Sequence, residues 1–329
     1  MMFNSYGGFM RILVISSIDK NAARQLSQEH DTVYHINPSQ EALMELIKDR
    51  EVLIFRSGVD ISSEVLCSAP SLKLLIRAGC GLDNIDLDYT KVHDITIRTI
   101  PQPAAFAVAE LTFAHILTLA RKTFEANQSM QKGEWKKNEL YGTLLTGKTL
   151  GIIGVGNIGT RVGQLGVAWG MRVIGNDIRN SQQRIYELKE LGIELIDFEA
   201  VLANADFLTL HTPLDETTYH LIDEKALAKM KRGAFILNMA RGGVVDEKAL
   251  YHELTEVKKL AGAALDVHEK EGAGKFSPFV GMANVVLSPH IGSTTYDTQR
   301  DIGRRIIAIV NDFAIELSLK PGQKLAAVA

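Results

Sequence analysis

Three ionisable side chains that follow apolar runs in the second half of the chain could together oxidise an alcohol beside a carboxylate. Arg241 follows AFILNMA, Glu271 lies in LDVHEKEG and His290 ends NVVLSPH. A guanidinium can hold a carboxylate and polarise the neighbouring oxygen in a geometry that lysine cannot match. A histidine can accept the hydroxyl proton because its ordinary pKa lies near neutral pH, and an adjacent carboxylate stabilises the imidazolium that forms. The three side chains are therefore a sufficient set for redox chemistry on a 2-hydroxy acid.

Each of these residues also has an ordinary explanation. An arginine at a strand end is often a surface or ion-pair residue, and the run HEKE around Glu271 is typical of a solvated face. His290 follows Pro289 and could simply cap a loop. The three lie too far apart in the sequence to share one helix face, so only the fold can bring them together.

A glycine pattern earlier in the chain predicts a nucleotide site. GIIGVGNIGT contains Gly154, Gly156 and Gly159, after a strand-like run and before a helix-like one. The first glycine allows a tight turn, the second lets a pyrophosphate approach the backbone, and the third lets helix and strand pack closely. Asp177 ends the next apolar run, where an acid can bind the adenosine ribose and favour NAD over NADP, although Arg179 tempers that preference. The alternative is a glycine turn that merely opens a helix in an α/β domain.

Strand-like and helix-like segments alternate along the chain, which predicts βαβ units and a mainly parallel sheet. Ligands of such sheets bind outside the carboxyl ends of the strands. We expect one α/β domain at 1–102, a second at 103–292, and a last helix within 293–329 that returns to the first. The predicted strands are RILVISS (11–17), EVLIFR (51–56), LKLLIRA (72–78), ITIRT (95–99), KTLGIIGVG (148–156), MRVIGND (171–177), IELID (193–197), DFLTLH (206–211), AFILNMA (234–240), LAGAALDV (260–267) and NVVLSPH (284–290).

Bulk composition excludes several classes of protein. The chain has 329 residues, a formal net charge of -3 and two cysteines. This charge indicates no nucleic-acid or membrane partner, and the cysteine content favours a reducing, cytoplasmic location. The apolar segment 104–120 carries Glu110 and His115, which favours a buried helix over a membrane span. No metal is expected, since His268 has no partner at metal-binding spacing.

The motifs together resemble the D-isomer-specific 2-hydroxyacid dehydrogenases. The matching stretches are GIIGVGNIG with Asp177, NMARGGVVD, AALDVHEKE and LSPHIGST. The resemblance implies a Rossmann-type nucleotide-binding domain inserted into a flavodoxin-like substrate domain, with the active site in the cleft between them. It implies Arg241, Glu271 and His290 as catalytic residues, NAD as the cofactor, and a homodimer formed through the helix region 104–122.

The resemblance also implies a set of cofactor contacts. Asp266 would contact the nicotinamide carboxamide, or else only cap the following turn. His211 would line the nicotinamide ribose, or else be a satisfied core histidine. The full implied set is Gly154, Gly156, Asn157, Ile158, Gly159, Asp177, His211, Thr212, Pro213, Met239, Ala240, Asp266 and Gly292.

Within this family, the amino-terminal half is most similar to the 3-phosphoglycerate dehydrogenases, in a short form that lacks a regulatory extension. The matching stretches are IFRSGVDIS, IRAGCGLDNIDL and MQKGEWKKNELYGTLLTGKTLGIIG. Several cations suit a phosphate dianion, although arginines at strand ends can be plain surface charges. The resemblance implies a substrate site that contains Arg56, Ser57, Arg77, Gly79 and, from a partner subunit, Lys137, together with Arg241 and His290.

Two departures from the family pattern leave the substrate open. Gly272 stands where the family usually has proline after the catalytic acid. PQPAAFAVAE replaces a stretch that usually holds an asparagine, for which Gln102 could substitute. Glyoxylate or hydroxypyruvate reductase and D-lactate dehydrogenase are therefore alternatives. A non-enzymatic alternative is an NAD-sensing protein similar to the corepressors of this family.

Overall fold

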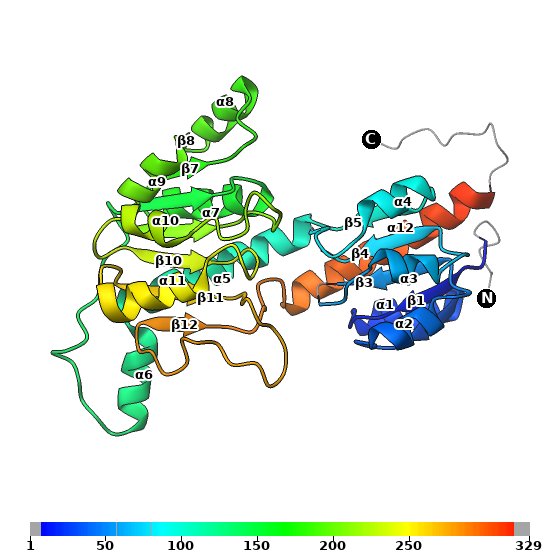
Figure 1. Cartoon of the computed structure of the whole chain (residues 1–329), viewed down its shortest axis with the longest axis horizontal. Coiled ribbons are helices and arrows are strands. Elements are labelled where there is room, and N and C mark those ends of the chain that lie inside the picture. The colour runs from blue at the N-terminus through cyan, green and yellow to red at the C-terminus, as the bar shows by residue number, and fades with distance from the viewer. Residues whose placement is uncertain (1–7, 57, 80, 319–329) are drawn as a thin grey trace. The chain divides into compact units, whose positions relative to one another are not determined.

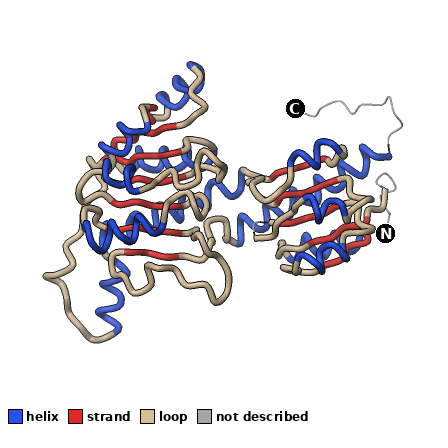
Figure 2. Tube along the Cα trace, viewed as in Figure 1, coloured by secondary structure: helices blue, strands red, loops and turns tan. Residues whose placement is uncertain are grey.

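The computed structural model describes residues 8–56, 58–79 and 81–318, and the chain divides into two compact units. One unit combines Met1–Pro103 with Thr294–Ala329, and the other is Ala104–Ser293. In each unit, parallel strands lie side by side between helices (Figures 1 and 2). The prediction of an α/β fold with one unit inserted into the other is confirmed.

The first unit is built on a five-stranded parallel sheet. Its strand order, β2-β1-β3-β4-β5, is the flavodoxin-like order. Two hydrophobic cores cover the two faces of this sheet. Ile12 packs into the core that includes α12, and the next residue, Leu13, packs into the core on the opposite face. The elements are β1 (Arg11–Val14), α1 (Lys20–Glu29), β2 (Asp31–Tyr34), α2 (Gln40–Leu46), β3 (Val52–Phe55), α3 (Ser63–Cys67), β4 (Leu74–Arg77), α4 (Leu87–Val92), β5 (Thr96–Thr99) and α12 (Tyr296–Ser318).

Strand β2 was absent from the sequence prediction, which was wrong at this point. Its sequence is DTVY, with only one aliphatic residue, and none of its four residues is buried. It lies at the edge of the sheet and pairs with β1 alone. A half-exposed edge strand needs no continuous apolar run, so the pattern that predicted the other strands is missing here.

The second unit is built on a seven-stranded parallel sheet with the order β12-β11-β10-β9-β6-β7-β8. The order reverses at β6, and the crevice at such a switch point is where dinucleotides bind in Rossmann-type sheets. The elements are α5 (Gln102–Arg121), α6 (Thr123–Gln131), β6 (Thr149–Ile153), α7 (Asn157–Ala168), β7 (Arg172–Asn176), α8 (Gln182–Glu190), β8 (Ile193–Leu195), α9 (Phe198–Asn204), β9 (Phe207–Leu210), α10 (Glu224–Lys229), β10 (Phe235–Asn238), α11 (Glu247–His252), the π-helix η1 (Glu253–Val257), β11 (Gly262–Leu265) and β12 (Val285–Leu287).

Helix α5 is the one helix among the described residues that is long and apolar enough to cross a membrane. In the structure, 61% of its apolar window is buried inside the protein. Phe113 and Ile116 belong to the core on one face of the seven-stranded sheet. Burying each such side chain contributes about 1.5–3 kcal/mol to folding. Its apolar character is therefore explained by its place in the core, as expected from the sequence.

Candidate active site

The three candidate catalytic residues lie in loops that follow three neighbouring strands. Arg241 follows β10, Glu271 follows β11 and His290 follows β12. These strands are adjacent and parallel, so their carboxyl ends lie on one edge of the seven-stranded sheet. The fold thus brings to one edge side chains that no helix could have held together.

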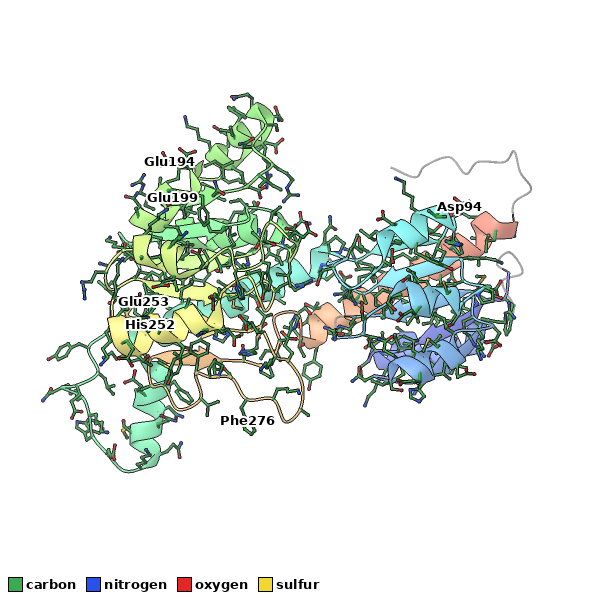
Figure 3. All side chains as sticks on the ribbon, in the orientation of Figure 1. Asp94, Glu194, Glu199, His252, Glu253 and Phe276 are labelled. Carbon is green, nitrogen blue, oxygen red and sulfur yellow. The ribbon has the colours of Figure 1, made fainter. Side chains whose placement is uncertain are left out.

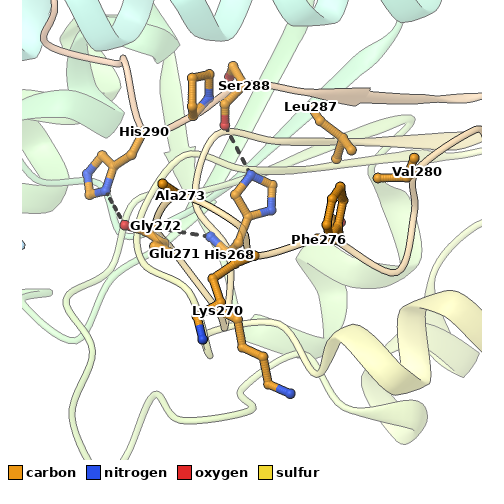
Figure 4. Close-up of a pocket in the computed structure, with 13 residues that line it drawn as sticks. His268, Lys270, Glu271, Gly272, Ala273, Phe276, Val280, Leu287, Ser288 and His290 are labelled. Atoms are coloured by element: carbon orange, nitrogen blue, oxygen red, sulfur yellow. Dashed lines mark hydrogen bonds and ion pairs between the residues drawn. The ribbon is translucent and has the colours of Figure 1, made fainter.

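His290 and Glu271 form a hydrogen-bonded pair. Nδ1 of His290 lies 3.0 Å from Oε2 of Glu271 (Figure 4). The other carboxylate oxygen of Glu271 accepts a hydrogen bond from the backbone N–H of His268 at 3.2 Å. Burial alone would raise the pKa of Glu271, but the hydrogen bond and charge of His290, together with the His268 N–H, outweigh it and lower that pKa. The carboxylate therefore stays ionised beside the imidazole.

Gly242 allows the loop after β10 to press against the loop after β11. A Cβ atom at this position would overlap the carbonyl group of His268 and approach the backbone nitrogen of Glu269 at 2.9 Å. Glu269 is itself clamped to α11, because its N–H donates to Glu247 Oε1 at 2.9 Å and its own Oε1 accepts the Glu247 N–H at 3.1 Å. The glycine beside the arginine is thus explained by close packing of the two loops.

Asn238, the last residue of β10, shapes the turn that carries Arg241. Its Nδ2 donates to the carbonyl of Arg241 at 2.9 Å, and its Oδ1 accepts the N–H of Ala240 at 3.1 Å. Nη1 of Arg241 donates to the carbonyl of Ala240 at 2.8 Å. The predicted site residues do not include Asn238, although an amide directly after the apolar run AFIL is a signal that the sequence offers.

A cavity of about 550 Å³ adjoins the His290–Glu271 pair. Its lining includes both of these residues, His268, Leu287 and Phe276 (Figure 4). The side chain of Phe276 projects from the loop between β11 and β12 and is largely exposed (Figure 3). The volume falls within the range of small-molecule sites.

Gly272 has a backbone φ of 119°. Proline is fixed near −65°, so the residue that the family usually has at this position could not adopt this conformation. The adjacent Glu271 nevertheless keeps its contact with His290. The departure from the family pattern therefore changes the local backbone and leaves the acid–histidine pair intact.

The glycine-rich turn has the geometry that a dinucleotide needs. Gly154 has φ 88°, and a Cβ there would lie 2.8 Å from the backbone carbonyl of His211. A Cβ at Gly159 would overlap the carbonyl oxygen of Gly154, so the turn can close only because both positions lack side chains. Gly156 forms the amino-terminal cap of α7, whose first N–H groups can receive an anion.

Asp177 lies beneath the side chain of Arg179. Its side chain is 5% exposed, whereas that of Arg179 is 72% exposed. The Arg179 backbone N–H donates to Asp177 Oδ1 at 2.8 Å, and Nε lies 3.3 Å from the same oxygen. A Cβ at Gly156 would lie 2.9 Å from Nη2 of Arg179, so the guanidinium also covers the glycine turn. The two residues with opposite influence on cofactor preference are thus one ion pair.

Two buried polar atoms beside the glycine turn have no hydrogen-bond partner among the described residues. They are Nδ1 of His211 and Oγ1 of Thr212. Nε2 of His211 meets Thr209 Oγ1 at 3.0 Å, and burial lowers the pKa of His211 to about 3, which keeps its ring neutral. Orphaned polar atoms at a switch point fit the ribose and amide groups of NAD, so the residues present fit this cofactor.

Asp266 is a buried junction between the strand ends. Its carboxylate accepts hydrogen bonds from Ser288 Oγ at 2.6 Å, Ile291 N at 2.9 Å and Gly292 N at 2.8 Å. The Asp266 carbonyl accepts the His290 N–H at 2.7 Å. The alternative to the implied nicotinamide contact is a cap on the turn directly after Asp266, whereas the carboxylate binds the turn that follows β12.

The predicted phosphate residues lie partly in the first unit. Arg56 follows β3, Arg77 ends the neighbouring β4, and a Cβ at Gly79 would lie 2.7 Å from Nη1 of Arg77. Arg77 is 5% exposed, and burial lowers the pKa of Arg56, whose Nη1 donates to Gln299 Oε1 at 3.3 Å. Lys137 is exposed on the segment between α6 and β6, and Ser57 lies outside the described residues.

The described residues contain one group of histidine and carboxylate side chains close enough to share a metal: His220, Asp246 and Glu269. Nε2 of His220 lies 3.1 Å from Glu269 Oε1, and its Nδ1 lies 3.8 Å from Asp246 Oδ2. Asp246 also caps α11. These contacts account for the cluster without an ion.

Comparison with known proteins identifies the family. Residues 113–292 match the model described as the NAD-binding domain of D-isomer specific 2-hydroxyacid dehydrogenases. The D-3-phosphoglycerate dehydrogenase of Methanocaldococcus jannaschii is 38% identical over 295 residues, which cover 89% of this chain and 55% of that protein. The hydroxypyruvate reductase of Thermotoga maritima is 37% identical over 302 residues, which cover 90% and 96%. The predicted nucleotide domain and reaction family are therefore confirmed.

Solved structures support the same assignment. The D-lactate dehydrogenase of Aquifex aeolicus, in complex with NAD and lactic acid, superposes with a TM-score of 0.84 at 29% identity over 92% of this chain and 95% of that one. The glyoxylate reductase from Paecilomyes thermophila superposes with a TM-score of 0.83 at 29% identity over 94% and 96%. The chain spans about half the length of the phosphoglycerate dehydrogenase it matches and nearly all of the hydroxypyruvate reductase.

Proposed function

The chain belongs to the D-isomer specific 2-hydroxyacid dehydrogenase family, and we propose that it interconverts a D-2-hydroxy acid and the corresponding 2-keto acid. The observation that carries this proposal is the 3.0 Å contact between His290 and Glu271, in loops beside the loop of Arg241. NAD, when bound, supplies the acceptor for the hydride that leaves C2.

In this proposal His290 moves the proton. Its Nδ1 faces Glu271, so Nε2 is the nitrogen that accepts the substrate's hydroxyl proton in oxidation and returns it in reduction. Glu271 holds the ring orientation and stabilises the imidazolium, because its lowered pKa keeps it charged. Arg241 binds the substrate carboxylate through its guanidinium.

We propose NAD as the preferred cofactor. The acid Asp177 directly follows β7, the second strand of the nucleotide fold, where it can bind ribose hydroxyls and repel a 2′-phosphate. Arg179 must move away from Gly156 when the pyrophosphate binds, and its exposed side chain is able to do so. The pairing of Arg179 with Asp177 reduces the repulsion, so the preference for NAD should be moderate.

For the substrate, we propose D-3-phosphoglycerate, which gives 3-phosphohydroxypyruvate at the entry to serine biosynthesis. Arg56 and Arg77 supply two cations at the ends of adjacent strands, and Gly79 leaves room beside Arg77. Ser57 and the partner subunit's Lys137 complete the proposed phosphate set. A relative that is 38% identical and named a D-3-phosphoglycerate dehydrogenase supports this choice.

The second candidate is a hydroxypyruvate or glyoxylate reductase. A relative that is 37% identical and named a hydroxypyruvate reductase supports it. Such an enzyme needs no phosphate-binding cations. In that case Arg56 and Arg77 serve the fold of the first unit, where Arg56 already contacts Gln299.

The test is a steady-state comparison of NADH formation and consumption on a small panel. The panel holds D-3-phosphoglycerate, its keto product, D-glycerate, hydroxypyruvate, glyoxylate and D-lactate. A kcat/KM for the phosphorylated pair at least tenfold above all others supports the proposed substrate. A preference for unphosphorylated acids supports the second candidate. Absence of turnover, with NAD-dependent recovery of a partner protein, supports the corepressor-like alternative.

We also propose a homodimer that uses the region around α5. The segments beside this helix expose large apolar side chains, among them Phe124, Met130, Trp135, Tyr141 and Leu144. Exposed apolar groups at this density are typical of an interface. Sedimentation equilibrium should give twice the chain mass, and a monomer at micromolar concentration would contradict the proposal.

A further inference from the structure

A buried series of hydrogen bonds connects helix α5 to the loop of His290. Nε2 of His115, on α5, lies 3.0 Å from Oγ of Ser288, and that hydroxyl donates to Asp266 Oδ1 at 2.6 Å. The exposed fractions of the three residues are 6%, 9% and 2%. Buried polar groups of this kind are retained only where their hydrogen bonds are satisfied.

The direction of these hydrogen bonds follows from the number of protons. Ser288 has one hydroxyl hydrogen, which it donates in its hydrogen bond to the carboxylate of Asp266. The serine oxygen must therefore accept from His115, so Nε2 of His115 carries a hydrogen. Burial lowers the pKa of His115, and the nearby Asp266 only partly opposes this effect. His115 thus acts as a neutral donor.

Asp266, the last residue of this hydrogen-bonded series, holds the backbone around His290. Asp266 accepts the N–H groups of Ile291 and Gly292, and its carbonyl accepts the N–H of His290. His290 has a φ of 54°, in the left-handed region that residues with a side chain rarely adopt. Such a conformation persists only where its surroundings hold it.

Ser288 also links the His290 loop to the loop of Glu271. Its carbonyl oxygen lies 3.0 Å from Nε2 of His268, and the backbone N–H of His268 donates to Glu271 (Figure 4). Ser288 therefore contacts both Asp266, which binds the turn of His290, and His268, which binds Glu271. Substituting the Ser288 side chain removes only the hydroxyl contacts with Asp266 and His115, because the contact with His268 belongs to the backbone.

We propose that His115 and Ser288 are positioning residues for the reaction: they orient the Asp266 carboxylate, which in turn holds His290 against Glu271. This inference rests on the proposed role of His290. His115 lies 173 residues from Ser288 in the sequence, so α5 contributes to the catalytic edge as well as to the core. Displacing a catalytic group by about 1 Å can reduce turnover about 100-fold.

Three variants and one control test the proposal. His115→Leu and Ser288→Ala remove the two donors, whereas His115→Gln retains an N–H donor at the end of the side chain. The control is Thr112→Val on the same helix, which removes a buried hydroxyl that bonds only to Val108 within α5. We expect kcat to fall about 10- to 100-fold for His115→Leu and Ser288→Ala. His115→Gln and Thr112→Val should stay within about threefold of the parent, and the dissociation constant for NADH should change little in all four.

Hydrogen exchange provides a readout that does not depend on turnover. Amides in a peptide covering residues 285–293 should exchange faster in His115→Leu and Ser288→Ala, but not in His115→Gln or Thr112→Val. Unchanged exchange and kcat in the first two variants would overturn the inference. So would losses of kcat in His115→Gln and Thr112→Val as large as those in His115→Leu. If the parent protein turns over no 2-hydroxy acid, the proposed function fails, and the exchange result still decides whether this network holds the loop.

Discussion

The carboxyl edges of the two sheets carry ionisable residues in different ways. In the seven-stranded sheet, the loops of Arg241, Glu271 and His290 are locked to one another through backbone and side-chain contacts. In the five-stranded sheet, Arg56 follows β3 and Arg77 ends the neighbouring β4, and Arg56 Nη1 donates to Gln299 Oε1 of α12. We therefore propose that the loops of the seven-stranded sheet hold the groups that react, whereas the arginines of the five-stranded sheet select the substrate.

The largest effect should come from His290. Replacing it with glutamine removes the group that exchanges the proton with substrate, and kcat should fall by about 100- to 10,000-fold. The loss should be similar for every acid the parent turns over, because the seven-stranded edge serves them all. Stopped-flow or steady-state NADH absorbance measures it. A loss of kcat on only one substrate would contradict the proposal that one sheet carries the reaction and the other selects the substrate.

Glu271→Gln should have the next largest effect. The amide keeps the shape of the side chain but no longer stabilises the imidazolium, so kcat should fall by about 100-fold or more. An unchanged kcat would contradict this role of Glu271.

The lowered pKa of Glu271 predicts that the free energy of unfolding depends on pH. The folded-state pKa of this residue lies below the ordinary value of 4.5, so its contribution is fully present above that value. As pH falls from 4.5 through the lowered pKa, the contribution should disappear. Chemical denaturation of the parent and of Glu271→Gln should therefore give a stability difference that shrinks in this window. A difference independent of pH down to 3 would contradict the pairing.

Substituting the arginines of the five-stranded sheet tests whether they select a phosphorylated substrate. Arg56→Gln and Arg77→Gln should each raise KM for a phosphorylated acid by about tenfold or more, since a hydrogen bond to a charged group contributes about 1.5–3 kcal/mol. Turnover of unphosphorylated acids should change little. Equal effects on both kinds of substrate would assign these arginines to the fold. Circular dichroism and thermal melts separate that outcome from unfolding.

Arg179→Ala should have the smallest effect. Removing the guanidinium exposes the charge of Asp177, so the kcat/KM ratio of NADH to NADPH should rise by several-fold. Arg172→Ala provides a matched control on the preceding strand, because its ion pair with Glu194 is exposed. A fall in the ratio would mean that Asp177 does not set the preference.

The apolar runs of the sequence predict most strands of the two sheets, because fully buried parallel strands must be apolar on both faces. Val52–Phe55 and Phe207–Leu210 are buried along their whole length, and both lie within predicted strands. Asp31–Tyr34 lies at an edge and gives no such signal. An apolar run in the sequence therefore indicates that a strand is buried, and an exposed edge strand can form without one.

For the candidate site, the sequence supplied the residue types, and the fold supplied their contacts. Arg241, Glu271 and His290 could be proposed from their chemistry, but their meeting depends on the strand order β12-β11-β10. The reason for Gly242 lies in its approach to His268, which no sequence spacing reveals. His115 was visible only as a lone histidine in an apolar segment, and its partner lies 173 residues away.

We propose that the edge of the seven-stranded sheet oxidises a D-2-hydroxy acid with NAD. The most direct measurement is the initial rate of NADH formation by the parent protein with the D and L enantiomers of one accepted acid, at matched concentrations. We expect a rate with the D enantiomer at least about 100-fold above that with the L enantiomer, because the site orients both the carboxylate and the hydroxyl of the substrate. Preferential oxidation of the L enantiomer, or no NADH from either, would contradict it.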